Sequence, residues 1–413
     1  MKYLPAVHVL TRRQALALPA LAVGTCAWAQ GTGQLPSGHW VGTWSTGMQP
    51  PRYPPVAQGF PGRTLRQIVF TSIGGQRVRV RFSNAFGTAP VNIGAARIAL
   101  QGSGAAIVPG SDRALTFDGK SGVAMAPGAS VLSDAVDFEV PARRSLAVSI
   151  FFPGFTGAPT LRFRSRQTNY VSPPGNFTAA ASLPVESTGF CVMQGGKQVC
   201  SSPWYFLDGV EVLAPAEVSA IVALGDSITG GAGTRDNANQ RWTDVLARRL
   251  QNEGLVRGVL NQGIDGNTLW TTYLSQNAQA RFQRDVLDAA GVKYVIVLLG
   301  INDLRTGVVA ERVIAALQQL AVRAHARGLR AYGGTLLPNA NAADSVEAAR
   351  QAVNRWIRGS GAFDAVIDFD AALRDPAWPR RLRPAYDSGD TLHPSPAGHE
   401  ALANAIDLEL FRS

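Results

Sequence analysis

The sequence predicts an α/β protein: a flavodoxin-like, doubly wound parallel sheet, preceded by an antiparallel, jelly-roll-like β-sandwich. After Pro215, short apolar runs alternate with helix-like segments, which is the pattern of parallel strands joined by crossover helices. Before it, apolar and polar residues alternate with a period of two, which is typical of half-buried antiparallel strands. A chain of 413 residues also favours two domains over one.

Residues 1–29 have the form of an export signal. Arg12 and Arg13 precede the apolar run Ala17–Cys26, and Ala27-Trp28-Ala29 has the small-x-small form of a cleavage site. The apolar run is too short to span a bilayer, which disfavours a membrane anchor. A lipoprotein anchored at the cysteine of that run is disfavoured by the residues before it. We therefore expect a periplasmic or extracellular protein, exported by the twin-arginine route and without a transmembrane segment.

The composition favours a folded, basic protein. Hydrophobic residues make up 46% of the chain and charged residues 16%, which supports sizeable cores and excludes wholesale disorder. The formal charge of +10 falls to about +7 without the signal, so an acidic polysaccharide or an anionic cell envelope is a candidate partner. No clustered Lys/Arg helix or nucleic-acid motif is present, and no nucleic-acid partner is expected.

Cys191 and Cys200 are the cysteines that remain after removal of the signal. If Gly195-Gly196 forms the two-residue turn of a hairpin, counting outward places the two cysteines opposite each other. An exported chain meets an oxidising compartment, so we predict a disulfide between them. A redox or zinc site is not expected, because there is no second cysteine pair and no C-x-x-C motif.

Residues 38–213 form the predicted β-sandwich. In the segment Arg77–Phe82, arginines alternate with Val78, Val80 and Phe82, as expected for a strand with one buried face. The same alternation returns in Val136–Val140 and in Leu146–Phe152, with turn-rich segments between them. Such a domain could bind carbohydrate or support the domain that follows it, and the support role is favoured because no aromatic platform is visible.

Residues 218–413 form the predicted catalytic domain. The very apolar run Tyr294–Leu299 indicates a central strand covered on both faces. A helix ending before Gly328 has a natural C-terminal glycine. Strands are expected near 219–224, 259–262, 294–299, 329–336 and 365–369, and helices near 242–250, 309–327 and 345–358 and after Pro396.

Four short motifs follow these strands in order. Gly-Asp-Ser-Ile stands at 225–228, a lone Gly263 follows the second strand, Gly-x-Asn-Asp stands at 300–303, and Asp-x-x-His-Pro at 390–394. Gly-Asp-Ser alone also fits a plain strand-to-helix turn, and Thr229 rules out the G-x-S-x-G elbow. Together, over roughly residues 218–410, the chain resembles the SGNH (GDSL) hydrolases. The region before it resembles the N-terminal β-sandwich of a secreted bacterial subset of that family.

The resemblance implies a serine esterase with an SGNH hydrolase fold. Ser227 is the expected nucleophile, His393 the general base and then acid, and Asp390 the group that orients the imidazole. The expected oxyanion hole consists of the Ser227 N–H, the Gly263 N–H and the Asn302 side-chain amide. No metal ion and no organic cofactor is expected.

The same residues also have plainer interpretations. Gly263 fits a position that needs glycine for backbone geometry alone. Asn302 fits a turn and Asp303 a helix cap, and we assign a structural role to Asp226. His393 is the histidine with an aspartate three residues before it on the same loop, which favours catalysis over a surface role.

The expected activity is hydrolysis of carboxylic esters through an acyl-enzyme, on a small ester or an acylated polysaccharide. Short acyl groups such as acetyl on carbohydrate are favoured. A lipase or polyester hydrolase, an acyltransferase and a non-catalytic carbohydrate-binding envelope protein remain alternatives. Four aromatic residues near the motifs are candidates for stacking on a sugar or acyl chain, or for plain packing: Trp270, Tyr273, Trp378 and Tyr386.

Overall fold

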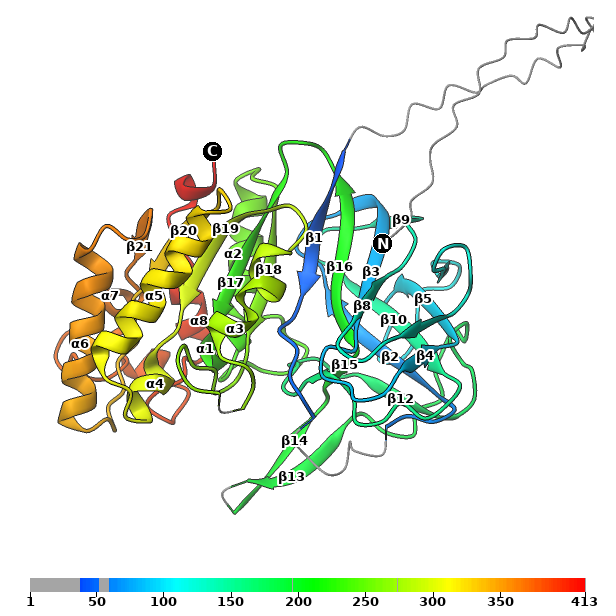
Figure 1. Ribbon diagram of the computed structural model, residues 1–413, viewed down its shortest axis with the longest axis horizontal. Helices are drawn as coiled ribbons and strands as arrows, with labels where there is room; N and C mark the ends of the chain where they lie inside the picture. The colour runs from blue at the N-terminus through cyan, green and yellow to red at the C-terminus, as the bar shows by residue number, and fades with distance from the viewer. Residues whose placement is uncertain (1–37, 52–58, 195, 273, 413) are drawn as a thin grey trace, which may run out of the picture. The chain divides into compact units, whose positions relative to one another are not determined.

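The computed structural model describes residues 38–51, 59–194, 196–272 and 274–412. Gly38–Ser413 form one compact unit, in which a parallel sheet with its helices adjoins a region of antiparallel strands (Figure 1). The predicted export signal at residues 1–29 lies outside the described residues, as does Tyr273. In the described part of the chain, no helix combines the length and apolar character that a bilayer crossing demands.

The C-terminal part contains the predicted parallel sheet. Its strands are paired in parallel in the order β18-β17-β19-β20-β21, which is the 2-1-3-4-5 order of a flavodoxin-like sheet. The prediction of a doubly wound sheet with Tyr294–Leu299 in a central strand is therefore confirmed. The strands are β17 (Ser219–Gly225), β18 (Arg257–Gly263), β19 (Val292–Leu298), β20 (Arg330–Gly334) and β21 (Ala365–Ile367).

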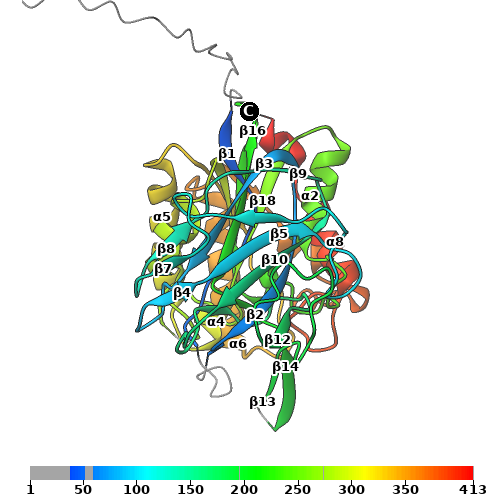
Figure 2. The same ribbon diagram turned by 90° about the vertical axis from the view of Figure 1, so that its right-hand side faces the viewer.

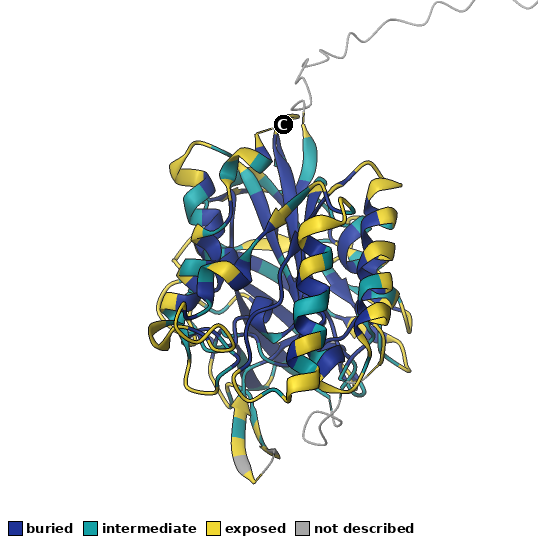
Figure 3. Cartoon of the chain, turned by 90° about the vertical axis from the view of Figure 1, so that its left-hand side faces the viewer, coloured by how far each residue is buried: buried dark blue, intermediate teal, exposed yellow. Residues whose placement is uncertain are grey.

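Helices cover both faces of this sheet because successive strand residues point to opposite sides. Ile221 and Ala223 of β17 join a hydrophobic cluster with α2 (Trp242–Asn252), α7 (Phe369–Leu373) and α8 (Pro396–Asn404). The next residues along the strand, Val222 and Leu224, instead join the cluster that contains α3 (Ala278–Phe282), α5 (Ala310–His325) and α6 (Asp344–Gly359). Figure 3 shows the buried strands between helices whose outer sides are exposed.

Short helical segments complete the C-terminal part. Three of them, α1, α4 and η2, directly follow a strand or a helix: α1 and α4 begin just after β17 and β19, and η2 is a π-helical continuation of α3. The bounds are α1 (Ser227–Gly230), η2 (Gln283–Leu287), α4 (Ile301–Arg305), η3 (Pro384–Tyr386) and η4 (Leu408–Phe411).

The N-terminal region consists of antiparallel strands in several sheets (Figure 2). One sheet has the order β1-β16-β3-β8, with β9 also paired to β3, and another has the order β12-β2-β10-β5-β6. The antiparallel character predicted for this region is confirmed, whereas the jelly-roll-like sandwich stays a prediction. The strands of the two sheets are β1 (His39–Ser45), β2 (Arg63–Phe70), β3 (Gly75–Ser83), β5 (Ala95–Leu100), β6 (Arg113–Leu115), β8 (Ser130–Leu132), β9 (Val136–Val140), β10 (Ser145–Phe152), β12 (Tyr170–Pro174) and β16 (Leu207–Ala214).

Smaller strand pairs lie beside these sheets, and one of them carries the disulfide. Cys191 of β13 (Phe190–Gln194) lies opposite Cys200 of β14 (Lys197–Ser201), and the two are bonded. The register and the pairing are those expected from a Gly195-Gly196 turn. The other pairs are β4 (Val91–Ile93) with β7 (Val123–Met125), and β11 (Leu161–Arg162) with β15 (Trp204–Tyr205).

The first strand of the antiparallel region lies against β18, the edge strand of the parallel sheet (Figure 1). A side chain at Gly42 of β1 would meet Leu260 Cδ1 at 2.8 Å, so the two strands approach closely only because glycine stands there. Polar contacts tie the same regions together: Gln262 Nε2 donates to Ser45 Oγ at 2.7 Å, and Val259 N donates to Ser72 Oγ at 2.9 Å. The edge of the catalytic sheet is therefore covered by the N-terminal region.

Candidate active site

Ser227 lies at the turn between β17 and α1, at the carboxyl edge of the parallel sheet. Asp226 caps the helix, since its Oδ1 accepts a hydrogen bond from Ile228 N at 2.9 Å. This places Ser227 at the first helical position, where a backbone N–H has no partner within the helix. Burial raises the pKa of Asp226 to about 7. Its carboxyl group is fully buried at the helix cap, in agreement with the structural role predicted for it.

His393 and Asp390 reach Ser227 from the loop before α8. Ser227 Oγ lies 2.8 Å from His393 Nε2, and His393 Nδ1 lies 2.5 Å from Asp390 Oδ2. An ionised carboxylate only accepts hydrogen bonds, so Nδ1 carries the proton and Nε2 is free to accept the serine hydroxyl. The three predicted residues are thus brought together in a continuous chain.

The Asp390 carboxylate is held in its ionised form. Partial burial acts against the charge, but the hydrogen bonds from the His393 side chain and backbone and from Leu392 N outweigh it, and the pKa of Asp390 lies well below its usual range. The same bonds fix the loop, because Asp390 Oδ1 accepts from His393 N at 2.8 Å and from Leu392 N at 3.1 Å. One side chain therefore sets both the backbone position of His393 and its tautomer.

Gly263 lies at the end of β18, in register with Gly225. A Cβ on Gly263 would meet Gly230 N at 2.2 Å, so β18 and α1 pack too closely for any other residue. The Gly263 N–H donates to Asn261 Oδ1 at 3.0 Å. The need for glycine is therefore steric, and the oxyanion role of its N–H stays a prediction.

Asn302 stands in α4, just after the neighbouring strand β19. Its Nδ2 donates to Asn267 O at 3.0 Å and lies 3.5 Å from Asp226 Oδ2. The bond to Asn267 fixes the direction of the side-chain amide. The contact with Asp226 is long, so the N–H involved could donate to a ligand in its place. Asn302 therefore lies beside Asp226, the residue before Ser227, and the oxyanion role of its amide stays a prediction.

Asp303 does not cap its own helix as expected. Its carboxylate accepts hydrogen bonds from Leu269 N, at 2.8 Å to Oδ2, and from Trp270 N, at 2.9 Å to Oδ1. Asp303 is fully buried and clamps the loop that follows β18 onto α4. Its role is structural, in agreement with the prediction, but its partners come from a different segment.

Arg281 of α3 is a site residue that the sequence did not reveal. The side chain is fully buried, and its Nη2 donates to Gly225 O at 3.0 Å and to Asn267 Oδ1 at 2.9 Å. Asn267 in turn accepts the Asn302 amide through its backbone oxygen. Arg281 therefore links the strand end before Ser227 to the residue that orients Asn302. No sequence pattern relates these positions, so only the folded structure shows the connection.

A cavity of about 450 Å³ opens beside His393. It lies between the end of α4, the loop before α6 and the His393 loop. Polar and apolar side chains share its lining, with Leu392, Val346 and two alanines as the apolar members: Arg305, Asn339, Asn341, Ala342, Ala343, Val346, Asp390, Thr391, Leu392 and His393. None of the predicted aromatic stacking residues that the structure describes (Trp270, Trp378, Tyr386) lines it.

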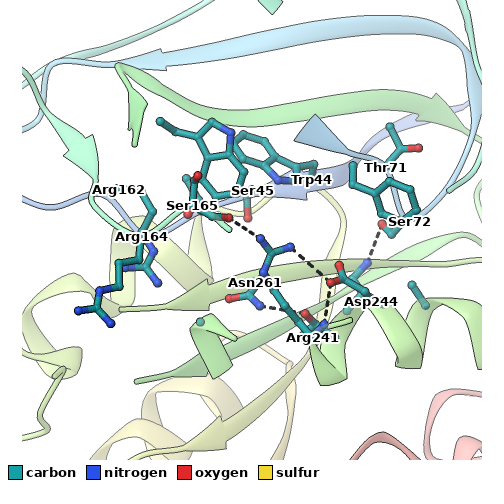
Figure 4. A pocket seen from close by; sticks show the side chains of 17 residues that line it. Trp44, Ser45, Thr71, Ser72, Arg162, Arg164, Ser165, Arg241, Asp244 and Asn261 are labelled. Carbon is teal, nitrogen blue, oxygen red and sulfur yellow. Dashed lines mark hydrogen bonds and ion pairs between the residues drawn. The ribbon is translucent and has the colours of Figure 1, made fainter. Parts of the chain in front are cut away.

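A smaller cavity of about 30 Å³ lies behind α1, between the antiparallel strands and the parallel sheet (Figure 4). This volume holds only one or two water molecules. Arg241 spans it, donating to the Ser165 carbonyl and lying 3.4 Å from Asp244. Arg162 is also buried there and donates to Asp265 Oδ1 at 3.0 Å. This cavity belongs to the contact between the two regions and has no room for a substrate.

Among the described residues, no group of three or more His, Cys, Asp or Glu side chains is arranged to hold a metal ion. Two other histidines, His325 and His399, have separate roles. His325 pairs with Asp364 at 2.8 Å on the surface. His399 is fully buried in α8, where its Nδ1 accepts from Trp242 N at 3.2 Å and its Nε2 donates to Ala232 O at 2.9 Å.

His399 should make the protein less stable in acid. Burial lowers the pKa of His399 to about 4, from 6.5 in an exposed histidine. Between these values only the unfolded chain binds the proton, so stability is lost as the pH falls from about 6.5 to 4, by about 3 kcal/mol. Urea unfolding at pH 4, 5, 6 and 7 should show this slope in the difference between the unfolding free energies of the wild type and His399→Gln.

The contribution of Asp226 has the opposite sign, because its raised pKa favours folding at low pH. The contribution of Asp226 is the same in the wild type and in His399→Gln, so it cancels in the difference between their unfolding free energies. Parallel pH profiles for the wild type and His399→Gln would show that His399 is protonated in the folded protein.

The fold and the site together define an esterase-type hydrolase with a nucleophilic serine on a flavodoxin-like sheet. Residues 223–401 match the GDSL-like lipase/acylhydrolase family. This part of the chain belongs to that family and is a carboxylic ester hydrolase domain with the SGNH hydrolase fold.

Several solved structures are similar to a part of this chain. Axe2, an acetylxylan esterase from Geobacillus stearothermophilus, is 22% identical over 45% of this chain and 91% of its own, with a TM-score of 0.36. TesA is 21% identical over 45% of this chain and 95% of its own, with a TM-score of 0.38. A GDSL-like lipase from Bacteroides thetaiotaomicron VPI-5482 is 18% identical over 45% of this chain and 85% of its own, with a TM-score of 0.35. No curated protein matches the chain.

Proposed function

We propose that the protein is an exported serine esterase that hydrolyses short acyl esters, such as O-acetyl groups on carbohydrate, through an acyl-enzyme on Ser227. The observation that carries this proposal is the hydrogen-bonded chain from Ser227 Oγ through His393 to Asp390. It supplies a nucleophile, a base within reach of it and a group that orients the base.

The geometry supports a two-step reaction. Ser227 Oγ attacks the ester carbonyl while His393 Nε2 takes its proton, and the tetrahedral intermediate collapses when the imidazolium protonates the leaving alkoxide. Water, deprotonated by the same nitrogen, then releases the acid from the acyl-enzyme. Asp390 stays ionised throughout and stabilises the imidazolium.

The oxyanion would be bound by the Ser227 N–H, the Asn302 amide and the Gly263 N–H. Asn302 supports this role best, because the bond to Asn267 orients its amide and leaves a second N–H with only a long contact to Asp226. Gly263 would have to share its N–H with Asn261. Loss of one such donor typically lowers the rate by about 10² to 10³.

The preference for a polar alcohol rests on the cavity beside His393. Arginine, asparagine and threonine side chains form much of its lining, which suits the hydroxyl groups of a sugar better than an alkyl chain. Export is proposed from the sequence of residues 1–29 and agrees with the Cys191–Cys200 disulfide, since such bonds persist in oxidising compartments.

For the antiparallel region, residues 38–213, we propose a supporting role toward the catalytic part, residues 218–413. Arg162 of β11 is buried and pairs with Asp265 on the loop after β18. A Cβ on Gly230 would meet the Arg162 guanidinium at 2.5 Å, so Arg162 packs directly against α1. These contacts brace the two segments that surround Ser227.

Hydrolysis of 4-nitrophenyl esters from acetate to palmitate tests the proposal. We expect the highest kcat/KM at acetate or butyrate and a decline as the acyl chain lengthens. A maximum at long chains would indicate a lipase or polyester hydrolase. Labelling by a fluorophosphonate reports the nucleophile independently of the substrate. No turnover and no labelling would leave the carbohydrate-binding alternative, and labelling with acyl transfer in place of hydrolysis would indicate a transferase.

A further inference from the structure

The cavity beside His393 adjoins the imidazole that must protonate the leaving group of the ester. In the proposed reaction, His393 Nε2 must come within hydrogen-bond distance of the leaving oxygen to protonate it. The alcohol that carries this oxygen must therefore lie next to the imidazole. The cavity of about 450 Å³ is lined by His393 and Asp390, and its volume is within the range of small-molecule sites, about 300 to 1,000 Å³.

Arg305 is the one arginine in the lining of this cavity. It is the last residue of α4, it is exposed, and it has no hydrogen-bond or ion-pair partner among the described residues. The cavity lining contains one carboxylate, that of Asp390, and its oxygens already accept bonds from His393 and Leu392. The Asp390 carboxylate stays ionised, so the formal charges of the lining cancel, but within the described residues no carboxylate pairs directly with Arg305.

Asn339 adds a directed donor in the same cavity. The residue is 5% exposed, and its Oδ1 accepts a hydrogen bond from Asn341 N at 3.3 Å. That bond leaves the amide N–H groups of Asn339 without an acceptor in the described part of the chain. The amide nitrogen is not one of the enclosed polar atoms without a partner, so its N–H groups are open to a ligand or to water in the cavity. The cavity thus offers a cation and hydrogen-bond donors to an acceptor-rich group.

We infer that this cavity binds an acidic sugar as the alcohol part of the ester, with Arg305 pairing with the sugar carboxylate. The inference rests on the proposed function and adds the substrate class to it. A guanidinium forms paired, charge-assisted hydrogen bonds with a carboxylate. The amide of Asn339 would donate a hydrogen bond to a neighbouring hydroxyl of the sugar. The formal charge of +10, about +7 without residues 1–29, favours approach of an anionic polysaccharide.

Two matched substrates test this inference: the mono-O-acetyl esters of methyl glucuronoside and of methyl glucoside, with acetate release as the readout. We expect the wild type to prefer the acidic ester about tenfold in kcat/KM, and Arg305→Gln to reduce this ratio to near one. Arg305→Lys should restore part of it. Addition of about 0.5 M NaCl should lower the ratio in the wild type, because the pair is open to solvent.

Arg327→Gln is the matched control. Arg327 is also exposed, has no partner among the described residues and lies beyond the end of α5, away from the cavity lining. It should keep the wild-type ratio. The same ratio in Arg305→Gln as in the wild type would overturn the inference.

Hydrolysis of 4-nitrophenyl acetate separates this outcome from failure of the proposed function. If that ester is hydrolysed and the sugar-ester ratio does not depend on Arg305, only the inference fails. If neither sugar ester is a substrate, competitive inhibition of 4-nitrophenyl acetate hydrolysis by methyl glucuronoside gives a second readout. Inhibition that is no stronger than that by methyl glucoside would also overturn the inference.

Discussion

Replacement of Ser227 by alanine should lower kcat for 4-nitrophenyl acetate by at least about 10⁴-fold, because the variant lacks the hydroxyl proposed to form the acyl-enzyme. The Ser227 hydroxyl is the group in contact with His393 Nε2, whereas the fold does not depend on it. We therefore expect the melting temperature to stay within a few degrees of the wild type. Steady-state kinetics and thermal unfolding on the same preparation measure both effects.

Ser103→Ala is the matched control, since Ser103 is an exposed serine of the antiparallel region, and it should keep full activity. His393→Ala should lose about as much activity as Ser227→Ala, and the double variant no more than either, because residues that act as a unit are not additive. Residual activity near the wild-type level in Ser227→Ala would show that another residue is the nucleophile.

Replacement of Arg281 by glutamine should impair both stability and rate. Arg281 pairs in the interior with Asp285 at 2.9 Å, and the breaking of a buried pair typically costs about 3 to 5 kcal/mol. The same change removes the donors that hold Asn267, and through it Asn302. A displacement of a catalytic group by about 1 Å can lower kcat about 10²-fold, so we expect a decrease of about 10- to 100-fold in kcat, with a smaller change in KM.

Arg284→Gln separates the two effects. Arg284 pairs with the same aspartate, at 2.6 Å, but makes no contact with Gly225 or Asn267. It should destabilise the protein less, since its side chain is partly exposed, and leave kcat within about twofold. Activity is compared below the melting temperature of each variant, by titration of the active serine. Equal kcat values for both variants would contradict the positioning role of Arg281.

The arrangement of the parallel sheet could be predicted because each of its elements has a strong local signal. Tyr294–Leu299 is apolar throughout, as a central strand requires. Gly328, which has a positive φ of 69°, follows the end of α5. Parallel strands place their carboxyl ends at one edge, so the three motifs that follow β17, β18 and β19 had to converge there. The Cys191–Cys200 bond followed from counting along a two-residue turn.

The contacts that orient the site could not be predicted. Arg281 and Asp303 act through loop backbone atoms and side chains that lie far from them in the sequence, and neither stands in a pattern that differs from an ordinary helix. The steric need for Gly263 depends on how closely α1 approaches β18, which is a property of the packed structure. Local patterns determine strands and turns, whereas these contacts exist only after the elements have packed together.

The cover that β1 provides for β18 limits how the catalytic part can be transferred or excised. A fragment that begins at residue 218 would present β18 with an open row of backbone donors and acceptors, and such sheet edges recruit strands from other molecules. Gly42, which allows the close approach to Leu260, would be lost together with the strand. A minimal catalytic unit or a chimeric enzyme therefore has to retain His39–Ser45 together with its partner strand β16.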